Sequence, residues 1–329
     1  MRLKTLALAL AAGALPLLAS GEVHAVSGEL TLYTSQPNED AQATVDAFQA
    51  LYPDVEVSWI RDGTVNVMAK LRAEIAAGAP QADVLLIADT VTMESLKDEG
   101  LLMAHDEADI SAYDPAIHDA DKTYFSTKLI TTGIVYNNDA PMVPTSWKDL
   151  EDEAMAGLVA MPSPLTSGAA LIHVATMVDH PDFGWAHFEA LEKNGVQPQG
   201  GNGAVFQAVA GGEKLYGIVI DYLPIREAAK GSPVTFAFPE EGVSAVTEPV
   251  AILSSTQNPE AAKAFVDFLL SPEGQVLAAS QGYLAAHPDI PPPEGFPPLA
   301  EISLLPFDAA KALANDSAYK ERFSELFGG

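Results

Sequence analysis

The chain has 329 residues, 48% of them hydrophobic, and its 17 Lys and Arg face 45 Asp and Glu, a formal net charge of −28. A chain this acidic is repelled by nucleic acid and by acidic membrane surfaces, so we expect no nucleic-acid partner. It has no cysteine, which excludes a disulfide framework and a lipid-modified cysteine. Its length exceeds what one hydrophobic core usually supports, so we expect a monomer with two lobes.

Residues 1–25 resemble a secretory signal peptide. Arg2 and Lys4 precede an apolar run, and Val23-His24-Ala25 offers a cleavage site after Ala25. No later stretch is apolar enough to span a membrane. We therefore expect a soluble protein, exported to a periplasm.

The next part of the chain alternates strands and helices. We expect strands at 29–34, 55–59 and 83–87 and helices at 40–52 and 64–77. This order predicts an α/β lobe with right-handed crossovers and a largely parallel sheet. Ligands of such sheets lie beyond the carboxyl ends of the strands, which places 35–39 and 88–90 at one rim.

The remaining elements suggest a second lobe and a return to the first. A helix is expected to start at Thr92, and an apolar β-branched strand at 129–136 is expected to cross between the lobes. The other expected strands are 158–161, 216–220, 234–238 and 242–253, of which the last two return the chain to the first lobe. The other expected helices are one capped by Ser146 and those at 167–179, 183–194, 204–210, 259–270 and 308–326. We predict a signal peptide at 1–25, lobe 1 at 26–130, lobe 2 at 131–245, and a return to lobe 1 with C-terminal helices at 246–329.

One turn has the features of an anion site. Strand 158–161 leads into a proline-stiffened turn, and Ser167 lies where a helix N-cap is expected. Gly168 and Ala169 have almost no side chain, so a ligand could approach the first N–H groups of the helix closely. Those groups have no partner within the helix and lie at the positive end of its dipole, which favours an anion. An ordinary capped helix is the alternative.

The whole chain after the signal peptide resembles a periplasmic solute-binding protein of an ABC importer, in the ferric-ion-binding-like family. The resemblance is carried by Leu30-Thr-Leu-Tyr-Thr-Ser-Gln36, Ala82-Asp-Val-Leu-Leu86, Thr166-Ser-Gly-Ala169, Asn202 with Phe206-Gln-Ala-Val209, Asp221-Tyr222, the segment from Ser255 to Val266, and Ser271-Pro-Glu-Gly274. It implies a type II fold with two α/β lobes, a hinge of crossing strands and a central cleft that closes on ligand.

The resemblance also argues against iron. Relatives that bind ferric iron use a His, a Glu and two adjacent Tyr, and the corresponding residues here are Pro37, Ala88, Tyr222 and Leu223. Three of the four oxygen or nitrogen donors are missing, so we expect no metal site. His173, His180 and His187 recur every seven residues, but Pro181 interrupts their helix.

The anion-binding part of the family pattern is retained. In iron-binding relatives a synergistic anion rests on the Ser-Gly-Ala turn and a nearby Asn, which correspond here to Ser167, Gly168, Ala169 and Asn202, with Thr166 as a further donor. Carboxylates expected at the rim would repel an anion but pair with the cationic end of a zwitterion. The resemblance therefore favours 2-aminoethylphosphonate. The expected carboxylates are Glu39, Asp89, Asp221 and Glu248, and further contacts are expected from Tyr33, Gln36, Tyr222 and Arg226.

The sequence thus predicts a receptor without catalysis or cofactor, which captures a small phosphonate or phosphate ester and delivers it to an ABC permease of the inner membrane. A sugar-phosphate receptor and a ferric receptor are alternatives of the same class. A secreted phosphate-ester hydrolase is the alternative from another class, although no metalloprotease, nucleophile-elbow or P-loop pattern is present.

Overall fold

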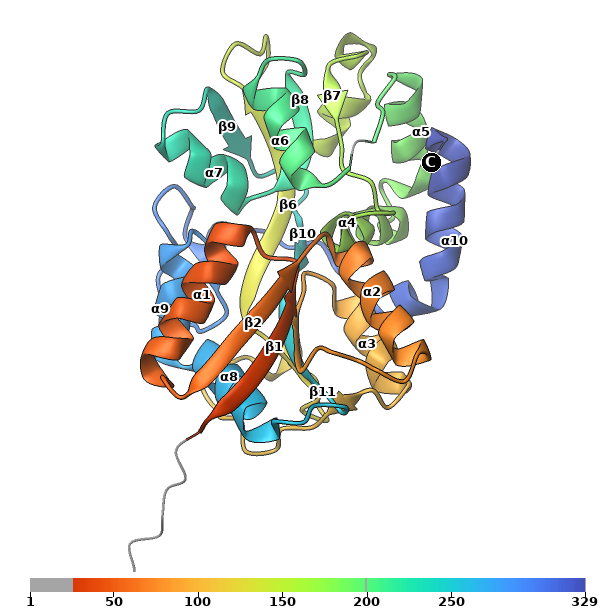
Figure 1. Cartoon of the computed structure of the whole chain (residues 1–329). Helices are drawn as coiled ribbons and strands as arrows, with labels where there is room; N and C mark the ends of the chain where they lie inside the picture. The colour runs from red at the N-terminus through yellow and green to blue at the C-terminus, as the bar shows by residue number, and fades with distance from the viewer. Residues whose placement is uncertain (1–25, 199, 329) are drawn as a thin grey trace, which may run out of the picture.

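The computed structural model describes residues 26–198 and 200–328, and the predicted signal peptide lies outside them. Two β-sheets, each with its own helices, lie one above the other (Figure 1). We refer to the first sheet with helices α1, α2, α3 and α8 as lobe 1, and to the second sheet with helices α4 to α7 as lobe 2. This is the expected two-lobe α/β architecture.

The sheet of lobe 1 has the strand order β2-β1-β3-β11-β4, and β5 also pairs with β11. Strand β1 is parallel to β2 and β3, whereas β11 runs antiparallel to its neighbours. The strands are β1 (Gly28–Thr34), β2 (Val55–Arg61), β3 (Val84–Leu86), β4 (Leu102–Met103), β5 (Tyr124–Ser126) and β11 (Pro249–Leu253); the helices are α1 (Asn38–Leu51), α2 (Thr64–Ala76), α3 (Thr90–Asp98) and α8 (Pro259–Leu270).

Alternation along β1 divides the lobe 1 core between the two faces of the sheet. Leu30 and Leu32 pack with Phe48 of α1 on one face, while Tyr33 packs with Leu71 of α2 on the other. Successive side chains of a strand point to opposite faces, so this strand fixes which helix covers which face.

The sheet of lobe 2 is built around the long strand β6, in the order β10-β6-β8-β7, with β9 and β12 also paired to β6. The strands are β6 (Lys128–Asn137), β7 (Val159–Ala160), β8 (Tyr216–Ile220), β9 (Val234–Ala237), β10 (Ser244–Val246) and β12 (Leu284–Ala285); the helices are α4 (Gly168–Asp179), α5 (Gly184–Lys193), α6 (Asn202–Ala210) and α7 (Tyr222–Ala229). The prediction that 234–238 and 242–253 both return to lobe 1 is wrong, because β9 and β10 pair with β6 and only β11 joins the first sheet.

The chain crosses between the sheets at two adjacent points. It passes from β5 to β6 through Thr127, and from β10 back to β11 through Thr247 and Glu248. The Thr127 and Lys128 N–H groups both donate to the Thr247 carbonyl, and the Thr127 hydroxyl donates to the Glu248 carbonyl. These bonds tie the two crossings into one hinge. Glu248 has a φ of 34°, a conformation that is uncommon for a residue with a side chain.

The C-terminal part of the chain connects the lobes a further time. It contains α9 (Pro272–Ser280) and the long α10 (Ala309–Phe327), and the short 3₁₀ turns of the molecule are Pro115–Ile117, Trp147–Glu151, Glu153–Met155 and Leu299–Glu301. Helix α10 packs against α3 of lobe 1 and against α4 and α5 of lobe 2, as the dark blue helix in Figure 1 shows. None of the described helices is long and apolar enough to cross a membrane.

Candidate ligand-binding site

A cavity of about 570 Å³ lies between the two lobes. Its walls include loops at the carboxyl ends of strands of both sheets, where α1, α2, α4 and α7 begin, and the segment before α6. This volume is within the range of roughly 300–1,000 Å³ that is usual for small-molecule sites. The position is the one that the strand order predicts.

The N-terminus of α4 opens on this cavity. Ser167 is the N-cap, and its hydroxyl accepts a hydrogen bond from the Ala170 N–H group at 3.3 Å. The N–H groups of Gly168 and Ala169 have no acceptor within the described part of the chain. Thr166, Ser167 and Ala169 line the cavity. The predicted capped helix is therefore present, and Ala169, one of the two residues with a free N–H group, lies at the cavity wall.

A second helix N-terminus adjoins the first. Helix α6 begins at Asn202, and its N-cap Gly201 has no side chain to cap it, so the helix offers backbone donors to the same cavity. The Asn202 amide donates to the Ser167 hydroxyl at 3.2 Å and accepts from the Ile220 N–H group at 3.2 Å. Asn202 thereby joins the N-terminus of α6 to that of α4. Two dipoles with their positive ends together favour a negatively charged group. We call the N-terminal turns of α4 and α6 the anion seat.

Gly168 has a different role from the one expected. A Cβ atom at this position would lie 2.6 Å from the Ala88 carbonyl oxygen and 2.7 Å from the Asp89 Cβ. Gly168 therefore allows the backbones of the two lobes to touch, and it does not itself line the cavity. Gly63 marks a second close approach, since a Cβ there would lie 3.0 Å from the Thr166 carbonyl oxygen. The lobes are in contact beside the anion seat.

Two of the expected rim carboxylates are structural groups. Asp89 is the N-cap of α3 and accepts from the N–H and hydroxyl groups of Thr92. Asp221 accepts from the N–H and hydroxyl groups of Thr131 at 2.9 and 2.7 Å and from the Tyr222 N–H group at 2.6 Å. Burial raises the pKa of Asp89, and it raises the pKa of Asp221 to about 7. Neither side chain lines the cavity.

The other two expected carboxylates do not offer a free charge to a ligand. Glu39 is exposed on the first turn of α1 and does not line the cavity. Glu248 does line it, but its carboxylate lies 2.7 Å from the Lys128 ammonium group, and both side chains are 3% exposed. Burial raises the pKa of Glu248 and the ion pair opposes that shift. The pair lies at the hinge, where it joins the two crossings.

Of the contacts expected from Tyr33, Gln36 and Tyr222, only Tyr222 lines the cavity. Tyr33 lies on the face of the lobe 1 sheet that α2 covers, where its hydroxyl donates to Glu74 at 2.8 Å. Gln36 is 1% exposed and does not line the cavity, and its side-chain amide stabilises the Glu248 carboxylate. Tyr222 is at the wall, and burial raises its pKa. Tyr222 is thus the one aromatic ring of the predicted set that reaches the site.

Two arginines at the cavity wall come from opposite lobes. Arg226 of α7, one of the expected contacts, lies at the wall and bridges the lobes through Asp40 of α1, with N–O distances of 3.0 and 3.2 Å. Arg61 was missed by the sequence reasoning, although it ends a strand directly before Asp62-Gly63, where rim residues are expected. Its Nε donates to the Gln36 carbonyl at 2.7 Å.

The positions that correspond to iron ligands also lie at this cavity. Pro37, Ala88, Tyr222 and Leu223 all line it. Three of these side chains have no donor atom, and burial disfavours the phenolate form of the fourth. No group of three or more His, Asp or Glu side chains that could hold a metal ion occurs within residues 26–198 and 200–328.

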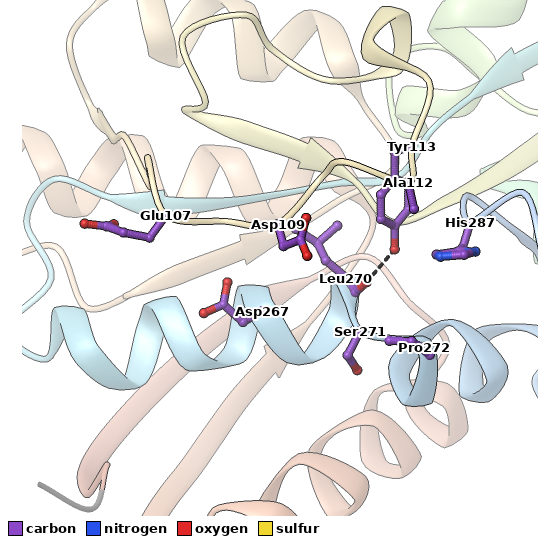
Figure 2. Close-up of a pocket in the computed structure, with 9 residues that line it drawn as sticks. All are labelled: Glu107, Asp109, Ala112, Tyr113, Asp267, Leu270, Ser271, Pro272 and His287. Carbon is purple, nitrogen blue, oxygen red and sulfur yellow. Dashed lines mark hydrogen bonds between the residues drawn. The ribbon is translucent and has the colours of Figure 1, made fainter. Parts of the chain in front are cut away.

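A second cavity, of about 370 Å³, lies on lobe 1 between the loop 107–113 and helix α8 (Figure 2). Its acidic groups have partners inside the protein: His105 bonds Asp267 at 2.7 Å, and Glu107 pairs with His105 and Lys263. Tyr113 donates to the Leu270 carbonyl, the dashed line in Figure 2. This cavity lies within one lobe, and its carboxylates serve internal contacts.

Comparisons with known proteins define the class of this molecule. A family model described as bacterial extracellular solute-binding protein matches residues 30–284. A Haemophilus influenzae protein without an assigned function is 31% identical over 296 residues, which cover 83% of this chain and 80% of that protein. The chain therefore belongs to the bacterial extracellular solute-binding proteins, the periplasmic components of ABC importers that bind small ligands and interact with a membrane permease.

Two further relatives have more specific names. The periplasmic binding protein AfuA from Actinobacillus pleuropneumoniae, in a structure with fructose-6-phosphate bound, is 25% identical with a TM-score of 0.83, over 91% of this chain and 98% of that one. The phosphoglycerate transport regulatory protein PgtC of Salmonella typhimurium is 25% identical over 211 residues, which cover 62% of this chain and 52% of PgtC. The family consists of binding proteins.

Proposed function

We propose that this protein captures a small phosphate monoester in the periplasm and delivers it to an ABC permease. The observation that carries the proposal is the anion seat, in which unpaired N–H groups of two helices meet at the wall of an interlobe cavity. Neutral backbone donors at converging helix ends suit the oxygens of a phosphate group. The relatives named above for fructose-6-phosphate and phosphoglycerate support a phosphorylated ligand.

The rest of the ligand is inferred from what lines the cavity. An amine would need a carboxylate free to pair with it, but Asp89 and Asp221 are engaged elsewhere and Glu248 is paired with Lys128. The wall instead offers polar groups such as Thr64, Asn66 and Asn202, which suit hydroxyl groups. We therefore place phosphorylated sugars and hydroxy acids before 2-aminoethylphosphonate. Asp62 is the observation that keeps the aminophosphonate as a second candidate, since its exposed carboxylate lines the cavity.

Isothermal titration calorimetry tests the proposal. We expect binding of fructose 6-phosphate or 3-phosphoglycerate, weaker binding of 2-aminoethylphosphonate, and neither heat nor a visible absorption band with ferric citrate. Release of inorganic phosphate from the same esters would show a hydrolase instead. Absence of binding by every phosphate and phosphonate compound would refute the proposed function.

A single isosteric variant tests the anion seat. Asn202→Asp keeps the oxygen that accepts from the Ile220 N–H group but replaces the amide that donates to Ser167 by a negatively charged oxygen. Two like charges about 4 Å apart repel by roughly 4 kcal/mol near a protein surface, so we expect at least a hundredfold loss of affinity for the phosphate ester. Asn315→Asp is the matched control, because it makes the same charge change at a half-buried position of α10 that does not line the cavity. Equal affinities of the two variants would contradict the assignment.

A further inference from the structure

Arg61 is a cation at the cavity wall that forms no ion pair within the described part of the chain. It is the last residue of β2, and its Nε donates to the Gln36 carbonyl at 2.7 Å, which fixes the inner edge of the guanidinium group. The neighbouring Asp62 carboxylate is turned to the start of α2, where it accepts from Gly63 N–H at 2.6 Å and from the Asn66 amide at 3.1 Å. The outer nitrogens of Arg61 therefore remain available to a ligand.

The same turn carries Arg61 toward the anion seat. Gly63, two residues further on, is so close to the Thr166 carbonyl that a Cβ would lie 3.0 Å from it, and Thr166 directly precedes the helix cap Ser167. Arg61 belongs to lobe 1 and Ser167 to lobe 2, yet both line one cavity. The contact between the lobes thus places the lobe 1 cation and the donors of lobe 2 on the wall of one cavity.

Arg226, the other arginine of the wall, is not in the same situation. Arg226 forms an ion pair with Asp40. Its guanidinium carbon also lies 5.4 Å from the centroid of the Tyr222 ring. A guanidinium group with no carboxylate at ion-pair distance is the better candidate for two-point recognition of phosphate, because its planar fork matches two phosphate oxygens. The neighbouring Asp62 carboxylate acts on Arg61 only through the field of its charge.

We propose that Arg61 is the specificity-determining residue that selects a doubly charged headgroup, a phosphate monoester or phosphonate dianion, over singly charged tetrahedral anions. The inference rests on the proposed function and names the charge state that the site takes. The neutral donors of the anion seat suit any tetrahedral anion, including a sulfate ester. A full positive charge from the other lobe stabilises the second negative charge, and does so only when the lobes meet.

The test compares a phosphate ester with a sulfate ester of the same sugar, which remains singly charged. The second pKa of a phosphate ester is about 6, so its charge doubles between about pH 5 and pH 7.5. The charged and titratable side chains at the wall are Arg61, Asp62, Tyr222, Arg226 and Glu248. Their own effect on binding appears equally in the sulfate series and can be subtracted.

We expect the wild type to bind glucose 6-phosphate at least tenfold more tightly than glucose 6-sulfate at pH 7.5, with most of the difference lost at pH 5. Arg61→Gln should lose at least tenfold for the phosphate at pH 7.5 and much less for the sulfate, and Arg61→Lys should fall between. Arg72→Gln is the matched control, since Arg72 pairs with Glu99 on the outer side of α2. Equal losses for the two esters, or no loss, in Arg61→Gln would overturn the inference while leaving the proposed function intact. Wild-type protein that binds neither these esters nor any other phosphate or phosphonate compound refutes the proposed function itself, and the inference with it.

Discussion

Substituting Gly168 by Ala tests whether contact between the lobes is required for tight binding. The added methyl group would lie 2.6 Å from the Ala88 carbonyl oxygen and 2.7 Å from the Asp89 Cβ, where ordinary contacts begin at 3.4 Å. The nearest atom must therefore retreat by about 0.8 Å. Because that atom belongs to the backbone of the other lobe, no side-chain rotation relieves the overlap, and the lobes must separate.

The cost can be estimated from the usual effect of overpacking, about 1–3 kcal/mol. If this destabilisation affects only the closed form, affinity for the phosphate ester falls by about 5- to 150-fold. The fold of each lobe should survive, because Gly168 is the first residue of α4 and has an ordinary backbone conformation that Ala also adopts.

The assay combines titration calorimetry, thermal unfolding and small-angle scattering. We expect Gly168→Ala to keep the unfolding temperature of the apoprotein, to bind more weakly, and to compact less on adding ligand. Ser317→Thr is the control, because it also adds one methyl group, at an exposed position of α10 that does not line the cavity. Wild-type affinity in a folded Gly168→Ala protein would refute the requirement for this contact.

Two further predictions concern buried charges. Burial raises the pKa of Asp221 to about 7 in the folded protein, from an ordinary value of 3.8. Between these two values the folded state binds a proton that the unfolded state has lost. The free energy of unfolding therefore falls as the pH rises from about 4 to 7. Asp221→Asn should gain stability relative to wild type by up to about 1.4 kcal/mol per pH unit between pH 4 and 7 in urea unfolding, and a constant difference would contradict this. Lys128→Met leaves the Glu248 carboxylate buried at the hinge without its partner and should lower the unfolding free energy by about 3–5 kcal/mol. The double variant Lys128→Met, Glu248→Gln should recover part of that loss. Equal losses in the single and double variants would contradict the stabilising role of this ion pair.

The sequence was sufficient for the architecture because its periodicities are local. Strand β1, helix α1 and strand β2 each begin and end where alternation, a proline or a glycine indicates. The two elements placed in the wrong sheet, β9 and β10, are short strands whose partner β6 lies about a hundred residues earlier, and no local pattern specifies that pairing.

The same distinction between local patterns and contacts of distant residues applies to the candidate site. Ser167 and Asn202 were predicted because helix starts have a recognisable pattern, and they meet in the structure. Asp221 was misjudged because its partner Thr131 is 90 residues away and holds the carboxylate against strand β6, away from the cavity. Asp89 could have been recognised as a cap, since a residue three positions later supplies the N–H group. Arg61 had a signal as well, a strand end beside a glycine.

Capture of an anion by a chain of formal charge −28 requires that local donors outweigh the distant charge. Exposed charges act over a Debye length, which shrinks from about 30 Å at 0.01 M salt to about 3 Å at 1 M, whereas the anion seat and Arg61 act at hydrogen-bond distance. The acidic surface should therefore slow the approach of the ligand without loosening the complex. We expect the association rate, measured by stopped flow, to rise with ionic strength and the dissociation rate to change little. An association rate that falls with added salt would mean that the cavity's own positive field dominates the approach.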